Sequence, residues 1–142
     1  MLCLTNYARR QRGLAPLRLN VVLHAAGQAK LAADVSCGEF SHTPCGRAFT
    51  TVFASYLKGA SSYRIGENIE WGTGGYGTPR EAMNGWLHSA PHRENILAAG
   101  YAELGIGYLA EQAFQGSTGA TLWSQEFGRR TVATQLRLRA HA

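Results

Sequence analysis

Two histidines and one glutamate, in three widely separated segments rich in Gly, Ser or Pro, carry the most reactive chemistry of this sequence. His42 ends the segment GEFSH, Glu67 lies in GENI, and His92 lies in PHRENIL. Imidazole and carboxylate groups bind divalent cations such as Zn²⁺ and also act as general acids and bases. Because 25 residues separate His42 from Glu67, and 25 separate Glu67 from His92, only the tertiary fold can bring the three together.

Three helices are expected in the first part of the chain. Apolar residues recur at helical spacing over residues 2–12 and 21–36, and Asn20 is a suitable N-cap for the second helix. An apolar face over residues 48–57 predicts the third helix. His42 is therefore expected in the connection between the second and third helices.

The middle of the chain predicts a loop followed by a helix. Residues 58–77 are rich in glycine, which favours a loop that presents Glu67. In the segment that follows, Thr78 is an N-cap and Glu81 completes a capping box, so we assign Glu81 to this structural role and not to catalysis. A shorter turn is expected to begin at His92.

Two strands are expected near the C-terminus. Residues 101–109 and 121–127 alternate between apolar and polar side chains, and the segment QGSTG between them predicts the turn of an antiparallel hairpin. Helices that precede strands indicate an α+β fold built in layers. Residues 131–142 have no periodicity and are expected to be a frayed tail.

The composition is that of a single folded domain. The 142 residues are 45% hydrophobic and 16% charged, which argues against wholesale disorder. The chain contains no run of about 18 apolar residues, so we expect no transmembrane segment. The N-terminus does not resemble a signal peptide, so the protein is either cytosolic or has lost an export signal. The net charge is +5, but no nucleic-acid-binding motif accompanies it, and we expect no nucleic-acid partner.

The three cysteines leave two alternatives open. Cys37 and Cys45 flank a loop short enough for a disulfide, which would hold His42 in place and would imply an oxidising compartment. Alternatively, both are free thiols of a cytosolic protein. We favour the disulfide, which leaves Cys3 buried, reactive or available as an alternative partner.

Several segments, taken together and in their order, resemble the CAP superfamily of cysteine-rich secretory proteins, antigen 5 and pathogenesis-related proteins. The similarity is greatest to its bacterial secreted branch and covers about residues 2–128. The matching segments are NYAR with Leu17, FSH, GENI, WLHSAPHRENIL, YAELGIG and WSQEFG. The resemblance implies one SCP-like domain over residues 1–128 and a basic C-terminal tail over residues 129–142.

The resemblance also implies a three-layer α-β-α sandwich with a small antiparallel sheet and a surface cleft. His42 matches the first cleft histidine of the family, Glu67 the cleft glutamate and His92 the second histidine. Some members bind Zn²⁺ or Mg²⁺ at such residues, so the resemblance implies a metal site formed by these three. Ser89 and Arg93 complete the expected ligand-binding cleft.

The sequence departs from the family pattern at two positions of the cleft. Ser89 stands where the family offers a further acid, and Pro91 replaces the usual glycine before the second histidine and stiffens the backbone. The incomplete set weakens both metal binding and any two-carboxylate mechanism. Glu94 could replace the missing acid. We assign His88 and His24 to structural positions on helices.

These features favour a secreted, monomeric CAP-domain protein whose cleft takes a small apolar, lipid-like or cell-envelope ligand, with a weak divalent metal at His42, Glu67 and His92. No serine-nucleophile, zinc-protease or phosphate-loop motif is present, and we assign no catalytic residue. The alternative is a metal-assisted, peptidase-like hydrolase that uses the same three residues. A third hypothesis is an anionic-polymer binder that uses arginine clusters near both ends of the chain.

Overall fold

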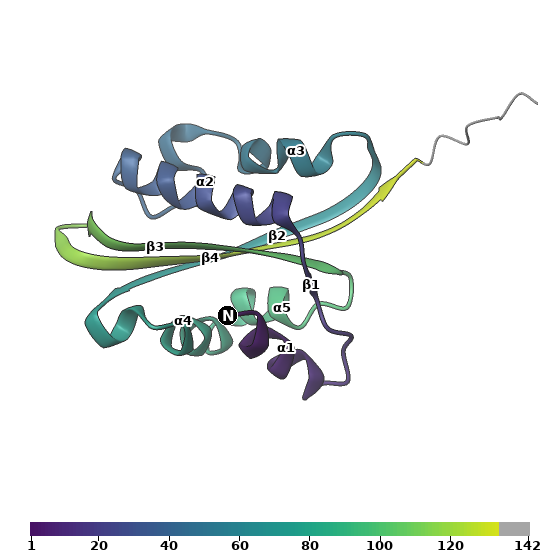
Figure 1. Ribbon diagram of the computed structural model, residues 1–142, viewed down its shortest axis with the longest axis horizontal. Coiled ribbons are helices and arrows are strands. Elements are labelled where there is room, and N and C mark those ends of the chain that lie inside the picture. Colours follow the sequence, from purple (N-terminus) through teal and green to yellow (C-terminus); the bar gives the residue numbers. More distant parts are fainter. Residues whose placement is uncertain (134–142) are drawn as a thin grey trace, which may run out of the picture.

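A four-stranded sheet is the central layer of the computed structural model, which describes residues 1–133 (Figure 1). Its strands, in spatial order, are β1 (Arg18–Leu19), β3 (Glu103–Phe114), β4 (Ser117–Val132) and β2 (Ala60–Thr73). Strand β1 pairs with β3 in parallel, and the other two pairs are antiparallel. The sheet is therefore mixed, whereas the sequence led us to expect an antiparallel one.

Helices cover both faces of the sheet, which confirms the expected three-layer α+β fold (Figure 1). One layer contains α2 (Val21–Cys37), the short 3₁₀ turns η1 (Pro44–Gly46) and η2 (Phe49–Phe53), and α3 (Ala54–Leu57). The opposite layer contains α1 (Leu2–Arg10), α4 (Pro79–Leu87) and α5 (Ala90–Ile96). A further 3₁₀ turn, η3 (Gly74–Gly77), connects β2 to α4.

The helix starts follow the local signals of the sequence. Asn20 Oδ1 accepts hydrogen bonds from Val22 N and Leu23 N, and so caps α2. Thr78 Oγ1 accepts from Glu81 N at 3.2 Å and caps α4. The third expected helix is present as the 3₁₀ turn η2 followed by the single turn of α3.

Strand β2 contradicts the loop expected over residues 58–77. It pairs with β4 from Ala60 to Thr73, and its side chains alternate between the two helical layers. Three of the glycines that suggested a loop, Gly66, Gly72 and Gly77, are sites of close approach. A Cβ at Gly72, for example, would lie 2.5 Å from the carbonyl oxygen of Tyr76. Pairing with a distant strand therefore outweighs the local preference of this glycine-rich segment for a loop.

The closing strand is longer than its sequence pattern indicated. Strand β4 continues through Arg129 and Arg130 to Val132, and both arginines are in register with residues of β2. The first residues of the expected tail over 129–142 therefore belong to the sheet. The rest of that tail, residues 134–142, lies outside the described residues.

Small residues bring α2 unusually close to the sheet. A Cβ on Gly27 of α2 would lie 2.8 Å from both Gly107 N and Ser124 Oγ, and a Cβ on Gly105 would clash with the backbone of Leu23. This contact fixes the height of α2 over β3 and β4. The next turn of the helix therefore holds Lys30, which is only 1% exposed, directly over the edge of the sheet that carries Glu67.

Candidate functional site

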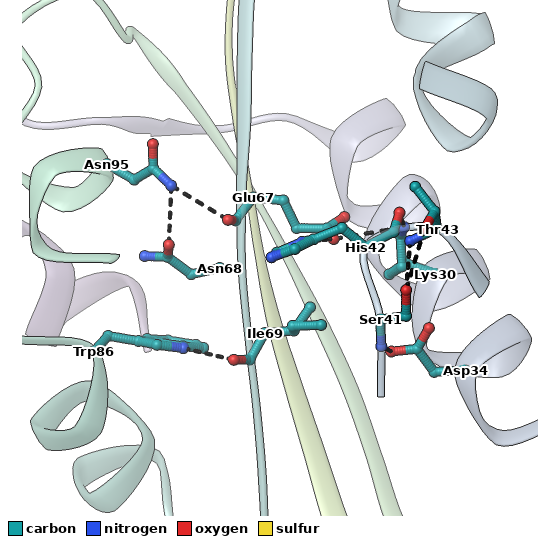
Figure 2. A network of polar contacts seen from close by, with 10 residues as sticks. All are labelled: Lys30, Asp34, Ser41, His42, Thr43, Glu67, Asn68, Ile69, Trp86 and Asn95. Carbon is teal, nitrogen blue, oxygen red and sulfur yellow. Dashed lines mark hydrogen bonds and ion pairs between the residues drawn. The ribbon is translucent and has the colours of Figure 1, made fainter. Parts of the chain in front are cut away.

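The polar site is built around the edge strand β2, whose successive residues point to opposite faces of the sheet. Glu67 points toward α2 and the loop that carries His42, whereas Asn68 points toward α5 (Figure 2). The strand thus separates the two histidines, because His42 comes from the α2 layer and His92 from the α5 layer. Both approach the same edge of the sheet.

His42 and Glu67 form the central contact of this site. His42 Nδ1 donates to Glu67 Oε1 at 2.7 Å, and Lys30 Nζ lies 3.5 Å from the same oxygen (Figure 2). Lys30 also donates to the carbonyl oxygen of His42. The Glu67 side chain has no exposed surface, whereas the His42 side chain is 48% exposed. The buried carboxylate therefore orients an accessible imidazole, whose Nε2 atom is left available to a ligand or substrate.

A disulfide holds the loop that carries His42. Cys37 at the end of α2 is bonded to Cys45 in η1, with 5.7 Å between their Cα atoms, which confirms the predicted pairing. Cys3 is a free, exposed cysteine. The bridge and the bond from Lys30 to the His42 carbonyl together fix the backbone on both sides of the imidazole.

His92 is oriented in a similar way by a different partner. Its Nδ1 atom lies 2.8 Å from Ser89 Oγ, so Ser89, at the position of the missing acid, holds this ring through its hydroxyl group. Burial and the charge of His42 lower the pKa of His92, whereas the carboxylate of Glu70 acts in the opposite direction. Glu70 is a nearby acid that the sequence analysis missed.

Asparagine side chains position the backbone between the two histidines. Asn68 Nδ2 donates to the carbonyl oxygen of His92 at 3.0 Å and to Gln125 Oε1 at 3.0 Å. Asn95 Nδ2 donates to the Glu67 carbonyl oxygen and to Asn68 Oδ1, at 3.2 and 3.0 Å (Figure 2). The asparagines of the GENI and PHRENIL segments therefore brace the site and leave the imidazoles as its chemical groups.

Two more buried acids lie beside Glu67, and neither was singled out from the sequence. Glu126 of β4 is directly opposite Glu67 in the β2–β4 register, and its oxygens have no hydrogen-bond partner among residues 1–133. Complete burial, together with the charge of Glu67, raises its pKa well above the ordinary value and favours the protonated acid. Asp34 of α2 is also buried, and burial raises its pKa to about 6.

The arrangement does not form a three-ligand metal centre. Within residues 1–133, no three His, Cys, Asp or Glu side chains are grouped so that they could hold a metal ion. Glu67 Oε1 is engaged by His42 and Lys30, and Glu67 Oε2 is buried without a partner. The Nδ1 contacts of His42 and His92 leave their Nε2 atoms as the uncommitted donors, a ligand type that suits Zn²⁺ better than the oxygen-seeking Mg²⁺. The predicted metal site remains a prediction.

The other candidates from the sequence lie away from this contact. Arg93 donates to the carbonyl oxygen of Leu87 at 3.1 Å and lines a different pocket, and His88 lines that pocket as well. His24 Nδ1 lies 2.7 Å from the Ile106 carbonyl oxygen on the exposed side of α2. Glu94 is exposed on α5, and its carboxylate makes no hydrogen bond or ion pair with the described residues.

An apolar cavity of about 520 Å³ lies next to the polar site, between α2 and the segment 44–55. Alanine and valine side chains of α2 line one wall, and Pro44 and Val52 lie on the other side. Lys30 lines the cavity and also contacts Glu67, so it connects the cavity to the polar site. His42, Glu67, Ser89, His92 and Arg93, the five residues predicted for the cleft, are absent from its lining.

Comparison with known proteins identifies a family and a relative that are similar in sequence to this chain. The model of the cysteine-rich secretory protein family, CAP, matches residues 2–127. The protein YkwD of Bacillus subtilis (strain 168), which is described as uncharacterized, is 30% identical over 125 residues. The match covers 87% of this chain and 44% of YkwD, so the chain spans less than half the length of that relative.

Solved structures share the fold at low sequence identity. An outer surface protein from Borrelia burgdorferi is 17% identical with a TM-score of 0.73, and the match covers 89% of this chain and 87% of that one. An extracellular protein containing a SCP domain from Bacillus anthracis str. Ames is 22% identical, also with a TM-score of 0.73, over 90% of this chain and 38% of that one. These structures show the shared fold, and the family model that matches residues 2–127 shows that the chain belongs to the cysteine-rich secretory protein (CAP) family.

Proposed function

We propose that this chain is an extracellular binding module that takes a small apolar, lipid-like or cell-envelope ligand into the cavity between α2 and segment 44–55. The observation that carries the proposal is the cavity itself. Its volume of about 520 Å³ falls within the range of small-molecule sites, roughly 300–1,000 Å³. Its walls are mostly aliphatic, which favours an apolar ligand.

The polar groups of the cavity indicate where a ligand's polar end would lie. Arg47 is exposed, and its side chain makes no hydrogen bond or ion pair with the described residues, whereas the charge of Lys30 is balanced by Glu67. Thr51 and Ser55 add two hydroxyl groups. A ligand with an apolar body and one polar or anionic end would therefore match this lining.

Two further observations support an extracellular location. The Cys37–Cys45 disulfide is typical of proteins that fold in an oxidising compartment. Of the two similar solved structures, one is an outer surface protein and the other is an extracellular protein. Among residues 1–133, no helix is both long and apolar enough to cross a membrane.

A fluorescent fatty-acid analogue tests the proposal directly. The wild type should bind it saturably, and Ala29→Phe should abolish binding because the new ring fills the cavity that Ala29 lines. Ala32→Phe is the matched control, since Ala32 is exposed on the same helix but does not line the cavity. No saturable binding by the wild type, or equal loss in both variants, would overturn the proposal.

A hydrolase is the second candidate function, and the His42–Glu67 contact favours it. In such a reaction His42 Nε2 would accept a proton from an attacking water, while Glu67 stabilises the imidazolium through Nδ1. Turnover of ester and peptide substrates should then fall sharply in both His42→Gln and Glu67→Gln. Turnover that is unchanged in these variants would exclude the mechanism.

The predicted metal can be tested separately from either function. Zinc titration by calorimetry on the wild type, His42→Ala and His92→Ala shows whether the two imidazoles share a cation. Binding that both single variants lose would place both Nε2 atoms at one ion. Binding that survives in either variant would contradict a shared site.

A further inference from the structure

A second pocket is lined by residues of α1, of the segment just after it and of α4 and α5. These helices lie on the opposite side of the sheet from α2, which lines the apolar cavity (Figure 1). We call it the α1–α5 pocket. Its volume is about 780 Å³, and its lining includes the polar side chains of Tyr7, Gln11, Arg12, His88 and Arg93. No aspartate or glutamate lines it.

The two arginines of this pocket lack a negative partner. In the described part of the chain, the ion pairs within 4 Å are those of Glu67 with Lys30 and with His42, so neither Arg12 nor Arg93 is neutralised. Both arginines are exposed at the mouth of the pocket, so water weakens the repulsion between their like charges without removing it. An anion bound in this pocket would be attracted by two positive charges that no carboxylate of the described residues balances.

The pocket is assembled before any ligand binds, because Arg9 ties its walls together. Arg9 is only 1% exposed, and its Nη1 atom donates to the carbonyl oxygens of Ile96 at 2.9 Å and Ala98 at 2.8 Å. These bonds join the C-terminal end of α1, next to Arg12, to the end of α5. The side chain of Arg93 is itself held by a 3.1 Å bond to a backbone carbonyl of α4. The walls and Arg93 are therefore ordered before a ligand binds, whereas the exposed Arg12 side chain would be ordered by the ligand.

We propose that the α1–α5 pocket binds the phosphoryl group of a phosphate ester, with Arg12 and Arg93 as its two guanidinium ligands. A phosphoryl group has three oxygens that accept hydrogen bonds, and planar guanidinium groups match it with paired N–H donors. The hydroxyl of Tyr7 and the amide of Gln11 supply further donors. Leu87 and Leu97, which also line the pocket, suit the organic part of the ester.

Phenyl phosphate, titrated by calorimetry, is the probe for this site. Arg12→Gln and Arg93→Gln should each weaken binding at least tenfold, since each removes a charge-assisted contact. Arg10→Gln is the matched control, because Arg10 is exposed on the same helix, carries the same charge and does not line the pocket. It should change the affinity less than twofold. Arg93→Lys keeps the charge but loses the paired donors, and should bind less tightly than the wild type.

Three results would overturn the proposal. One is the absence of saturable binding of phenyl phosphate at millimolar concentration. Another is an equal loss in all three arginine-to-glutamine variants, which would indicate non-specific charge attraction. The third is binding of benzoate as tight as that of phenyl phosphate, which would show that the pocket does not prefer a phosphoryl group over a carboxylate. Melting curves of every variant verify that each remains folded.

A second experiment distinguishes a lipid headgroup from a soluble phosphate ester as the ligand. Sedimentation with phosphatidylglycerol vesicles, but not with phosphatidylcholine vesicles, that depends on Arg12 and Arg93 would identify a lipid headgroup. Binding of phenyl phosphate without vesicle binding would identify a soluble ester. The proposal does not rest on the apolar cavity, so Ala29→Phe should leave phenyl phosphate binding unchanged, whatever its effect on the fatty-acid analogue.

Discussion

Asp34 offers the most direct link between this structure and the pH dependence of stability. Its side chain is buried on α2; Oδ2 accepts a long 3.4 Å bond from Ser41 N, and Oδ1 has no partner among the described residues. Burial raises its pKa from the ordinary 3.8 to about 6, against the opposing effects of the Ser41 bond and the charge of Lys30. The charged form of Asp34 is thus disfavoured in the folded protein.

The sign of the effect follows from this raised pKa. The folded protein holds the Asp34 proton more tightly than the unfolded chain, so the stabilisation is complete below pH 3.8 and is lost as the pH rises to about 6. The two pKa values differ by about 2, which corresponds to about 3 kcal/mol at about 1.36 kcal/mol per pH unit. Asp34→Asn keeps the shape and an acceptor oxygen but cannot ionise. It should therefore match the wild type near pH 4 and exceed its stability by up to about 3 kcal/mol above pH 7.

Urea unfolding of both proteins between pH 4 and pH 8 measures this difference. The stability gap between Asp34→Asn and the wild type should open between pH 4 and about pH 6 and stay constant above pH 7. Glu94→Gln is the control, because this exposed carboxylate makes no hydrogen bond or ion pair with the described residues and should show no such trend. A gap that is the same at every pH would refute the argument that burial of Asp34 controls its ionisation.

Three further outcomes follow from the packing around the site. Lys30→Met removes the buried cation beside the acids and should lower the free energy of unfolding in urea by about 3–5 kcal/mol, whereas Lys58→Met at an exposed position should leave it nearly unchanged. Gly105→Ala drives a methyl group into the backbone of α2 and should lower the melting temperature strongly, whereas Gly75→Ala, which has open space around its Cβ, should not. Reduction of the disulfide, whose cysteines are 8 residues apart, should destabilise the fold by about 2–3 kcal/mol in paired unfolding curves with and without reductant; coincident curves would show that the bridge adds no constraint.

Local signals explain why most helices could be predicted from the sequence. Caps such as Asn20 and Thr78 act within three residues of themselves, so their effect can be read without knowing the fold. Strand β2 could not be recognised in this way. Its pairing partner lies about half the chain away, and glycines such as Gly66 and Gly72 indicate close packing only once their neighbours are known.

The residues of the candidate site also fall into those that local motifs identify and those that only the fold identifies. The resemblance of short motifs identified His42 and Glu67, and the structure brings these two side chains together. The charged groups behind them were missed because they lie within apolar patterns. Lys30 and Asp34 are four residues apart on α2, on the face that also buries Leu23 and Gly27. A pair of charged residues on an otherwise apolar helix face was the one feature of the sequence that could have indicated a buried polar site there. Glu126 could not be identified from the sequence, because only the β2–β4 register shows that it lies opposite Glu67.

The buried charges also determine what the polar site can do. Glu67 has no exposed oxygen, because Oε1 faces His42 and Lys30 and Oε2 is enclosed next to Glu126. A metal ion that recruited Glu67 would have to displace Lys30, and would leave a buried ammonium without its partner at a cost of several kcal/mol. The same carboxylate can hold the His42 ring without any rearrangement. The fold thus favours an oriented imidazole over a three-ligand metal centre, and Lys30 is the residue that sets this preference.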